Sequence, residues 1–369
     1  MSHLNEKNHT IQCVQCAASL TYDPGSTSLA CQYCGAENEI IVESTGDHLI
    51  EQSFHDFEKE IIDNTIESQM IQCNHCAAQF EIKETEGSGE CAFCCTPYVV
   101  NQVKSSKVHK PTSVLPFLID QHAARGYFKE WIHSLWWAPS AIKELGKHLR
   151  RLQGIYYPYW TYDCETGTHY NGERGDYYYV TRTRQVRGED GNYKSEQYQE
   201  RRTRWTPAIG HVFNSFDDIL VPAHNSLDRK TLNELEPWAM DQLQPYSSQF
   251  IQGFTLLNYE VSMRDGFHQF AKPQIETAVD STIRQDIGGD EQRIYSMDLD
   301  FSHQTFKHIL LPVWVSSYRF KGKVYHITIN ASTGEVQGER PYSWIKISLA
   351  VICAIIVIVG VILLVKFYA

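Results

Sequence analysis

The sequence lacks three motifs that carry common enzyme chemistry. It has no Gly-x-x-x-x-Gly-Lys-Ser/Thr phosphate-binding loop, no Gly-x-Ser-x-Gly nucleophile turn and no His-Glu-x-x-His zinc-protease helix. The first absence excludes a P-loop helicase, and the other two argue against an α/β-hydrolase and a metalloprotease. The sixteen histidines are scattered along the chain. We therefore expect a protein that is not an enzyme.

The N-terminus lacks an apolar run of the kind that directs secretion. Residues Met1 to His9 are polar, so we expect no signal peptide and a reducing compartment. Disulfides are not expected there, yet the chain has eleven cysteines, nine of them between residues 13 and 95. This clustering indicates metal binding.

Basic residues are scarce in the N-terminal third. Residues 1–110 hold 16 Asp/Glu and 6 Lys/Arg, a net charge of −10 (6 − 16), whereas the rest of the chain holds 28 and 27. Nucleic-acid binding depends on Lys and Arg side chains that neutralise phosphates. The charge therefore disfavours nucleic acid as a partner of this region.

What the N-terminal third does contain is a duplicated four-cysteine motif. Each copy has the spacing Cys-x2-Cys-x14-Cys-x2-Cys, and the flanks repeat too, as in Ile11-Gln12-Cys13 and Ile71-Gln72-Cys73. Four thiolates complete a closed tetrahedral zinc site, and the metal supplies folding energy on the order of 10 kcal/mol. We predict two tandem zinc ribbons, residues 10–42 and 70–102, and two Zn²⁺ ions per chain. The predicted ligands are Cys13, Cys16, Cys31, Cys34, Cys73, Cys76, Cys91 and Cys94.

Several features of the ribbons leave alternatives open. Iron is chemically allowed in place of zinc, and a redox or disulfide role for the cysteines is the rival interpretation. Cys95 replaces the glycine that the first ribbon has as Gly35, so it is a bystander, exchanges with Cys94 as ligand, or acts in redox chemistry. Ala17 and Ala77 stand where such turns often place glycine, which predicts a slight backbone strain.

An acidic linker, residues 43–69, is expected between the ribbons. The stretch 37–67 holds ten acidic residues and one lysine. Its apolar residues at helical spacing predict an amphipathic helix, which is either simply solvated or docks a basic partner. These residues are Ile50, Phe54, Phe57 and Ile61. A polar linker, residues 103–111, follows the second ribbon.

Residues 112–343 are aromatic-rich and mix helical and strand patterns, which predicts an α+β domain. Asp120 is a predicted N-cap of one helix, and a second helix is expected from Pro273 to about Gln285. The residues expected to face inward are Ala124, Phe128, Trp131, Ile132 and Leu135 in the first helix and Ile275, Val279 and Ile283 in the second.

Two sequence echoes predict that this domain is a duplicated helix-plus-sheet unit. Pro158-Tyr159-Trp160 is echoed by Pro312-Val313-Trp314, and Gly172-Glu173-Arg174 by Gly338-Glu339-Arg340. The expected halves are residues 112–245 and 250–343. The second half is similar to PepSY or cystatin-like domains.

A basic hairpin is predicted within the first half. Two strand-like runs, Tyr177 to Arg187 and Tyr193 to Trp205, flank a Gly-Glu-Asp-Gly-Asn turn. The hairpin is either an exposed element with cross-strand ion pairs or a contact for anionic lipid headgroups or an acidic partner. The candidate contact residues are Arg182, Arg184, Arg187, Arg201, Arg202 and Arg204.

The chain ends in a predicted transmembrane helix. Residues 347–365 carry no charge, and as a helix they span about 28 Å, close to the thickness of a bilayer core. Tyr342, Trp344 and Lys346 on one side and Lys366 on the other are typical interfacial residues. We expect a single-pass tail anchor in the inner membrane, with the N-terminal bulk in the cytoplasm.

Several segments outside the paired ribbons form a distinctive set together with them. They are Tyr157-Pro158-Tyr159-Trp160, the run from Tyr170 to Asp176, Ile287-Gly288-Gly289-Asp290, Leu310-Leu311-Pro312-Val313-Trp314 and Gly338 to Ser343. Through these segments and the ribbons, nearly the whole chain resembles the YdjG-like group, bacterial membrane-bound proteins with TFIIB-type zinc ribbons. The resemblance implies a membrane adaptor that works beside SPFH (flotillin-like) and phage-shock membrane proteins, and it brings no catalytic residues.

Two functions follow as hypotheses. The first is a non-enzymatic, membrane-anchored adaptor whose ribbons dock protein partners and whose middle region lies near membrane lipids. The alternative is a membrane-tethered nucleic-acid-binding protein, because many zinc ribbons contact DNA or RNA. The acidic charge of residues 1–110 favours the first.

Overall fold

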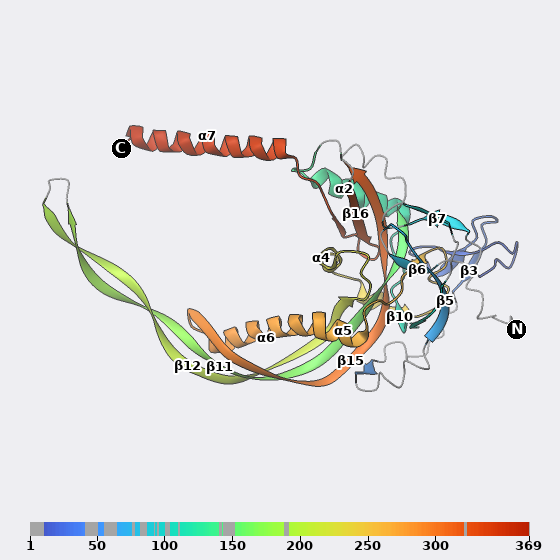
Figure 1. Ribbon diagram of the computed structural model, residues 1–369, viewed down its shortest axis with the longest axis horizontal. Coiled ribbons are helices and arrows are strands. Elements are labelled where there is room, and N and C mark those ends of the chain that lie inside the picture. The colour runs from blue at the N-terminus through green and yellow to red at the C-terminus, as the bar shows by residue number, and fades with distance from the viewer. Residues whose placement is uncertain are drawn as a thin grey trace.

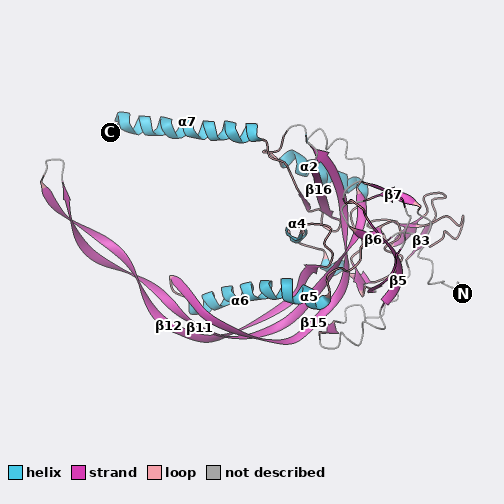
Figure 2. Ribbon diagram, viewed as in Figure 1, coloured by secondary structure: helices cyan, strands magenta, loops and turns pink. Residues whose placement is uncertain are grey.

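The computed structural model describes residues 11–40, 51–54, 65–75, 78–81, 87–91, 93, 96–99, 104–109, 111–139, 142, 152–187, 192–320 and 323–368. Strands predominate in these ranges, and one long helix, α7 (Trp344–Tyr368), projects from the body (Figure 2). The predicted α+β domain is therefore mostly β.

Three very long antiparallel strands form the frame of a nine-stranded sheet. They are β11 (Gln153–Arg187), β12 (Tyr193–Pro222) and β15 (Glu291–Phe320), with β11 in the middle. β15 begins opposite Gly175, so β11 and β12 continue beyond it as a two-stranded arm, residues 176–187 and 193–204 (Figure 1). The arm contains the two strands of the predicted basic hairpin.

Shorter elements complete the fold. The helices are α2 (Gln121–Ser134), α4 (Arg229–Asn233), η2 (Met240–Gln242), α5 (Met263–Gly266), η3 (Phe267–Ala271) and α6 (Lys272–Ile287). The other strands are β1 (Thr21–Tyr22), β2 (Ser28–Ala30), β3 (Glu37–Glu39), β4 (Gln52–Ser53), β5 (Thr65–Gln72), β6 (Gln79–Glu81), β7 (Ser88–Glu90), β8 (Pro97–Val99), β9 (Lys104–His109), β10 (Ser113–Val114), β13 (Gln244–Pro245), β14 (Thr255–Leu256), β16 (Lys323–Asn330) and β17 (Val336–Gly338).

Both predicted helices of the middle region are confirmed. The carboxylate of Asp120 caps α2 by accepting the Ala123 N–H at 2.6 Å. Three of its apolar residues, Ala124, Phe128 and Ile132, are buried. α6 covers the inner face of the long strands through Ile275, Val279, Ile283 and Ile287. The helices are stabilised by these apolar stripes rather than by their polar faces.

The start of β11 is buried on both faces. Alternate residues of a strand point to opposite sides of a sheet. Tyr156 packs with α2 and with residues 11–40, here named the first Cys segment. Tyr157 and Tyr159 pack with the described residues between 65 and 99, named the second Cys segment. The two Cys segments thus cover opposite faces of one sheet, which explains why this strand reads as a continuous aromatic run.

Backbone hydrogen bonds repeat in the two halves of the middle region. The Pro158 carbonyl accepts the Ala223 N–H at 2.9 Å, and the Pro312 carbonyl accepts the Ala331 N–H at 3.0 Å. Each alanine carbonyl in turn accepts two N–H groups from the segment before a helix of the other half. The donors are Glu260 and Val261 to Ala223, and Leu118 and Ile119 to Ala331.

The two echoed tryptophans complete this exchange. Trp160 Nε1 donates to the Val261 carbonyl and Trp314 Nε1 to the Ile119 carbonyl, both at 2.9 Å. Each indole therefore bonds the residue before the N-cap of the other half's helix. Short parallel strands repeat the pattern, since β14 pairs with β11 and β10 with β15. These matched contacts interlock the two predicted halves, and their duplication stays a prediction.

The amphipathic helix expected in the acidic linker is wrong where the structure describes that linker. Gln52 and Ser53 form strand β4, which pairs with β15 through Ser53 and Thr305. Phe54 packs edge-on against Phe267, with ring centroids 5.0 Å apart. This tertiary contact outweighs the helical spacing of the apolar residues. The other three residues of the predicted stripe, Ile50, Phe57 and Ile61, lie outside the described residues.

Candidate metal centre

Two tight turns present the four cysteines of the first Cys segment. In each turn the first cysteine N–H donates to a carbonyl five residues on: Cys13 to Ala18 at 2.8 Å and Cys31 to Ala36 at 2.9 Å. The turns need one residue with positive φ, and these are Ala17 (58°) and Gly35 (72°). The expected strain at Ala17 is thus confirmed, because an L-residue with a Cβ rarely adopts this conformation.

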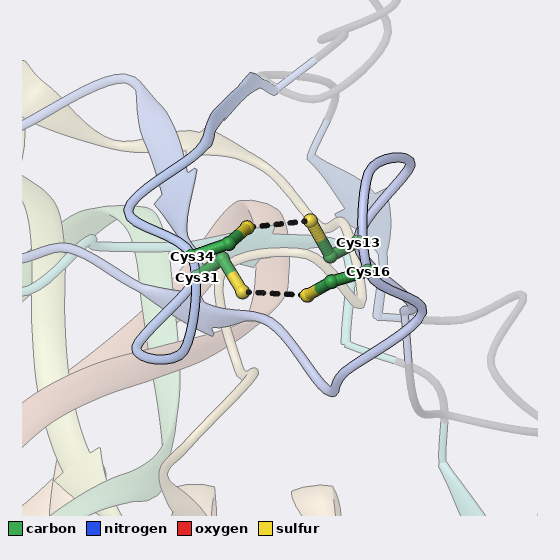
Figure 3. A group of neighbouring side chains, drawn as sticks. All are labelled: Cys13, Cys16, Cys31 and Cys34. Atoms are coloured by element: carbon green, nitrogen blue, oxygen red, sulfur yellow. Dashed lines mark hydrogen bonds between the residues drawn. The ribbon is translucent and has the colours of Figure 1, made fainter.

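The four sulfur atoms converge on one point. Cys13 Sγ lies 3.6 Å from Cys34 Sγ, and Cys16 Sγ lies 3.5 Å from Cys31 Sγ (Figure 3). All four lie within 4.8 Å of one another. A disulfide would need about 2.05 Å, whereas a tetrahedral zinc site with Zn–S bonds of about 2.3 Å separates its sulfurs by about 3.8 Å. The cluster can therefore hold one zinc ion, with no coordination position left open.

Backbone amides favour the thiolate form of Cys13 and Cys31, whereas the pKa values of Cys16 and Cys34 are raised, because contacts with the neighbouring thiols outweigh the lowering by backbone amides. Amide hydrogen bonds from Cys34 and Tyr33 lower the pKa of the Cys31 thiol to about 6. The pKa of Cys13 is lowered by the amides of Gln15 and Cys16, and the Gln15 N–H lies 3.4 Å from the Cys13 sulfur. Since metal ligation requires thiolates, these N–H···S contacts suit a metal site.

The second Cys segment repeats the backbone pattern of the first. The Cys73 N–H donates to Ala78 at 2.9 Å and the Cys91 N–H to Thr96 at 3.0 Å, each sixty residues beyond its counterpart. The β7–β8 pairing repeats the β2–β3 pairing at the same offset. Two of the predicted ligands, Cys73 and Cys91, are buried. The other two, Cys76 and Cys94, lie outside the described residues, as does Cys95, so a second four-sulfur cluster is not shown.

Both Cys segments are docked on the middle region. In the first, the Tyr22 N–H donates to the Gln252 carbonyl at 2.9 Å and the Gly25 N–H to the Phe117 carbonyl at 2.8 Å. In the second, the Gln79 carbonyl lies 3.1 Å from His224 Nε2. The metal centre is consequently part of the folded body rather than a separate domain joined to it by a flexible linker.

One position of the repeat is used differently in the two segments. Phe93 is 1% exposed, its carbonyl contacts His326 Nε2 at 2.7 Å, and its ring stacks on His224. Its counterpart in the first segment, Tyr33, is 83% exposed. Val14, in the other turn of the first segment, is exposed as well. The first Cys segment therefore presents two apolar side chains beside its cysteines.

The structure places the six candidate arginines on the arm, away from the cysteine cluster (Figure 1). Several form cross-strand ion pairs: Arg182 with Glu200, and Arg184 with Glu196 at 2.8 Å, while Arg202 pairs with Glu200 at 3.3 Å along its own strand. Two others lie over tyrosine rings: Arg201 over Tyr177 at 4.3 Å and Arg204 over Tyr178 at 5.3 Å. Arg187, the sixth, is exposed at the end of β11.

A polar cluster at a bulge of β11, in which Asp163 and Lys307 are buried, was not predicted. Carboxylates of Glu51, Asp163 and Asp217 converge within 4.8 Å. The ammonium of Lys307 lies 3.3 Å from Glu51 and 3.2 Å from Asp218. Burial raises the pKa of Asp163 to about 6. The residues of this cluster are far apart in the sequence, so no local motif predicts it.

The comparisons with known proteins give one distant relative. The chain is 23% identical over 338 residues to the uncharacterized protein YdjG of Bacillus subtilis strain 168, a match that covers 91% of each chain. No protein-family model matches the sequence. No solved structure matches it.

Proposed function

We propose that the chain is a non-enzymatic, membrane-anchored adaptor that holds two zinc ions and docks protein partners at the cytoplasmic face of the inner membrane. The observation that carries this proposal is the exposed pair Val14 and Tyr33 on a closed four-cysteine cluster. A closed site offers no position for substrate, so its role is to shape the surface around it. Exposed apolar side chains on a rigid support are typical of protein docking.

The second zinc ion would be held by Cys73, Cys76, Cys91 and Cys94. Its support is the identical cysteine spacing and the recurrence of both turn hydrogen bonds at Cys73 and Cys91. Because this segment uses Phe93 to dock on the middle region, its zinc would stabilise the body. The first segment would be the one that meets a partner.

The membrane anchor would be α7. It is long and apolar enough to cross a bilayer, and none of its most apolar stretch is buried. Positive charge directly before it favours a cytoplasmic body, because Arg340 and Lys346 lie near its start. Only Lys366 lies at its far end.

The arm would lie at the headgroup layer of the same membrane. It extends from the same side of the body as α7 (Figure 1), and its ion pairs exclude it from hydrocarbon. Insertion of α7 therefore requires α7 to leave the body at a different angle from the arm. The arm's exposed arginines and tyrosines suit anionic headgroups.

The partner we propose is a membrane-associated protein of the SPFH or phage-shock type, as the resemblance to the YdjG-like group implies. Affinity purification from solubilised membranes tests the docking surface. Full-length Val14→Ser/Tyr33→Ala should lose the partner while it retains zinc and stays in the membrane. The control is Tyr193→Ala, which removes another exposed tyrosine, this one from the arm. Retention of every partner by the double variant would remove the support for docking at this surface.

The competing nucleic-acid function has a clear test. Counterion release makes such binding fall steeply with salt, and residues 1–110 have 16 acidic against 6 basic groups. The adaptor proposal expects no appreciable binding of the detergent-solubilised full chain to DNA or RNA at about 150 mM salt. Tight, salt-sensitive binding that persists in an Arg201→Ala/Arg204→Ala variant would favour the nucleic-acid alternative.

A further inference from the structure

A cluster of exposed aromatic side chains surrounds the start of α7. Trp136 is 72% exposed and Trp344 is 79% exposed, and Trp137 and Tyr342 are exposed as well. Trp136 and Trp137 belong to the turn that ends α2, more than two hundred residues earlier in the chain. Tryptophan is a large apolar residue that a soluble surface rarely exposes in groups.

Hydrogen bonds tie this turn to the first turn of α7. The Ser343 N–H donates to the Trp137 carbonyl at 2.8 Å. The ammonium of Lys346 donates to two carbonyls, that of Trp136 at 3.1 Å and that of Ala138 at 2.8 Å. Lys346, an expected interfacial residue, thus joins α7 to the turn that follows α2. Trp136 and Trp137 therefore lie beside the point where the chain would enter a membrane.

We infer that the turn at Trp136 and Trp137 is a second membrane contact, seated in the headgroup layer of the bilayer that α7 crosses. The inference rests on the proposed anchoring by α7. Tryptophan favours this layer because its ring is apolar and its N–H can remain hydrated.

The position of the turn at the base of α7 keeps it at the interface. A change in the angle between α7 and the body displaces residues near the pivot least, and Trp136 and Trp137 are bonded to residues at that pivot. The contact would hold α2, and with it the first Cys segment that shares its core cluster, at a fixed height above the lipid. The arm alone could not do so, because it extends away from that core.

Quenching of tryptophan fluorescence by brominated lipid tests the inference on the full chain. The chain is reconstituted into vesicles of phosphatidylcholine and phosphatidylglycerol, with or without acyl-chain bromine on the phosphatidylcholine. Trp136, Trp137 and Trp344 are three of eight tryptophans. If all eight emit equally, the quenched fraction should fall from about 0.4 to about 0.2 in the Trp136→Phe/Trp137→Phe variant, because these rings lie at the interface. Trp238→Phe, which removes a buried tryptophan, should raise the fraction slightly.

Extraction of the same vesicles with alkaline carbonate distinguishes failure of the α7 anchor from failure of the second membrane contact. A chain that stays in the vesicles while the double variant shows less quenching supports the inference. If the chain stays and quenching is unchanged in the double variant, the second contact is wrong and the anchor stands. If carbonate releases the chain and bromine has no effect, both the anchor and the second contact are wrong.

Discussion

Gly35 offers the cleanest perturbation of the metal centre. It has φ of 72°, and a Cβ added there would meet no atom within 4 Å. Gly35→Ala therefore introduces only the backbone strain of the left-handed conformation, roughly 1–2 kcal/mol. The reduced freedom of the unfolded chain offsets about 0.4–1 kcal/mol of this. The net loss of about 1 kcal/mol corresponds to about fivefold weaker zinc binding at this site.

Competition with a chromogenic chelator measures this effect on the detergent-solubilised full chain. In Gly35→Ala, one of the two expected zinc ions should be released at about fivefold lower chelator activity, and release of the other should be unchanged. Ala17→Gly, at the equivalent residue with φ of 58°, should strengthen zinc binding, so release should need a higher chelator activity. Ala18→Gly is the matched control, because the neighbouring residue lacks a positive φ and should only lose stability. Equal effects of the two Ala→Gly changes would refute the reasoning.

Two further predictions concern the middle region. Trp160→Phe and Trp314→Phe each remove one 2.9 Å hydrogen bond in equivalent positions, so each should lower the free energy of unfolding by a similar amount, about 1–2 kcal/mol. Trp238→Phe is the control, because its indole nitrogen has no hydrogen-bond partner among the described residues, and unequal losses for the first two would argue against equivalence. The carboxyl of Asp163 has its pKa raised from 3.8 to about 6 by burial, so its contribution to stability is complete below pH 3.8 and is lost as the pH rises through 6. Asp163→Asn should therefore gain up to about 3 kcal/mol relative to wild type between pH 4 and pH 8 in denaturant titrations, and a constant difference across that range would contradict the burial effect.

The features that sequence predicts well here are local. The cap at Asp120, the apolar stripe of α6 and the uncharged run of α7 are each encoded within about twenty residues, and the structure confirms each element. The cysteine spacing likewise places four sulfurs of the first segment within reach of one ion. Periodicity and ligand spacing act over short distances, so a single sequence contains them.

The features that sequence misses depend on contacts between distant segments. Nothing local shows that the two Cys segments cover opposite faces of one sheet, or that Phe93 is buried while Tyr33 is exposed. The echo of Trp160 and Trp314 indicated a duplication, but the exchange of hydrogen bonds between the halves requires the fold. The helical spacing around Phe54 predicted a helix wrongly, because pairing of β4 with β15 outweighs the local helical pattern.

Zinc content tests the central claim most directly. The full chain, purified in detergent under reducing conditions, should contain two zinc ions per chain by elemental analysis. The Cys16→Ser variant should contain one zinc ion, in the second Cys segment, and its body should stay folded. Wild-type protein with no zinc, or with one ion that Cys16→Ser retains, would contradict the account of the candidate metal centre.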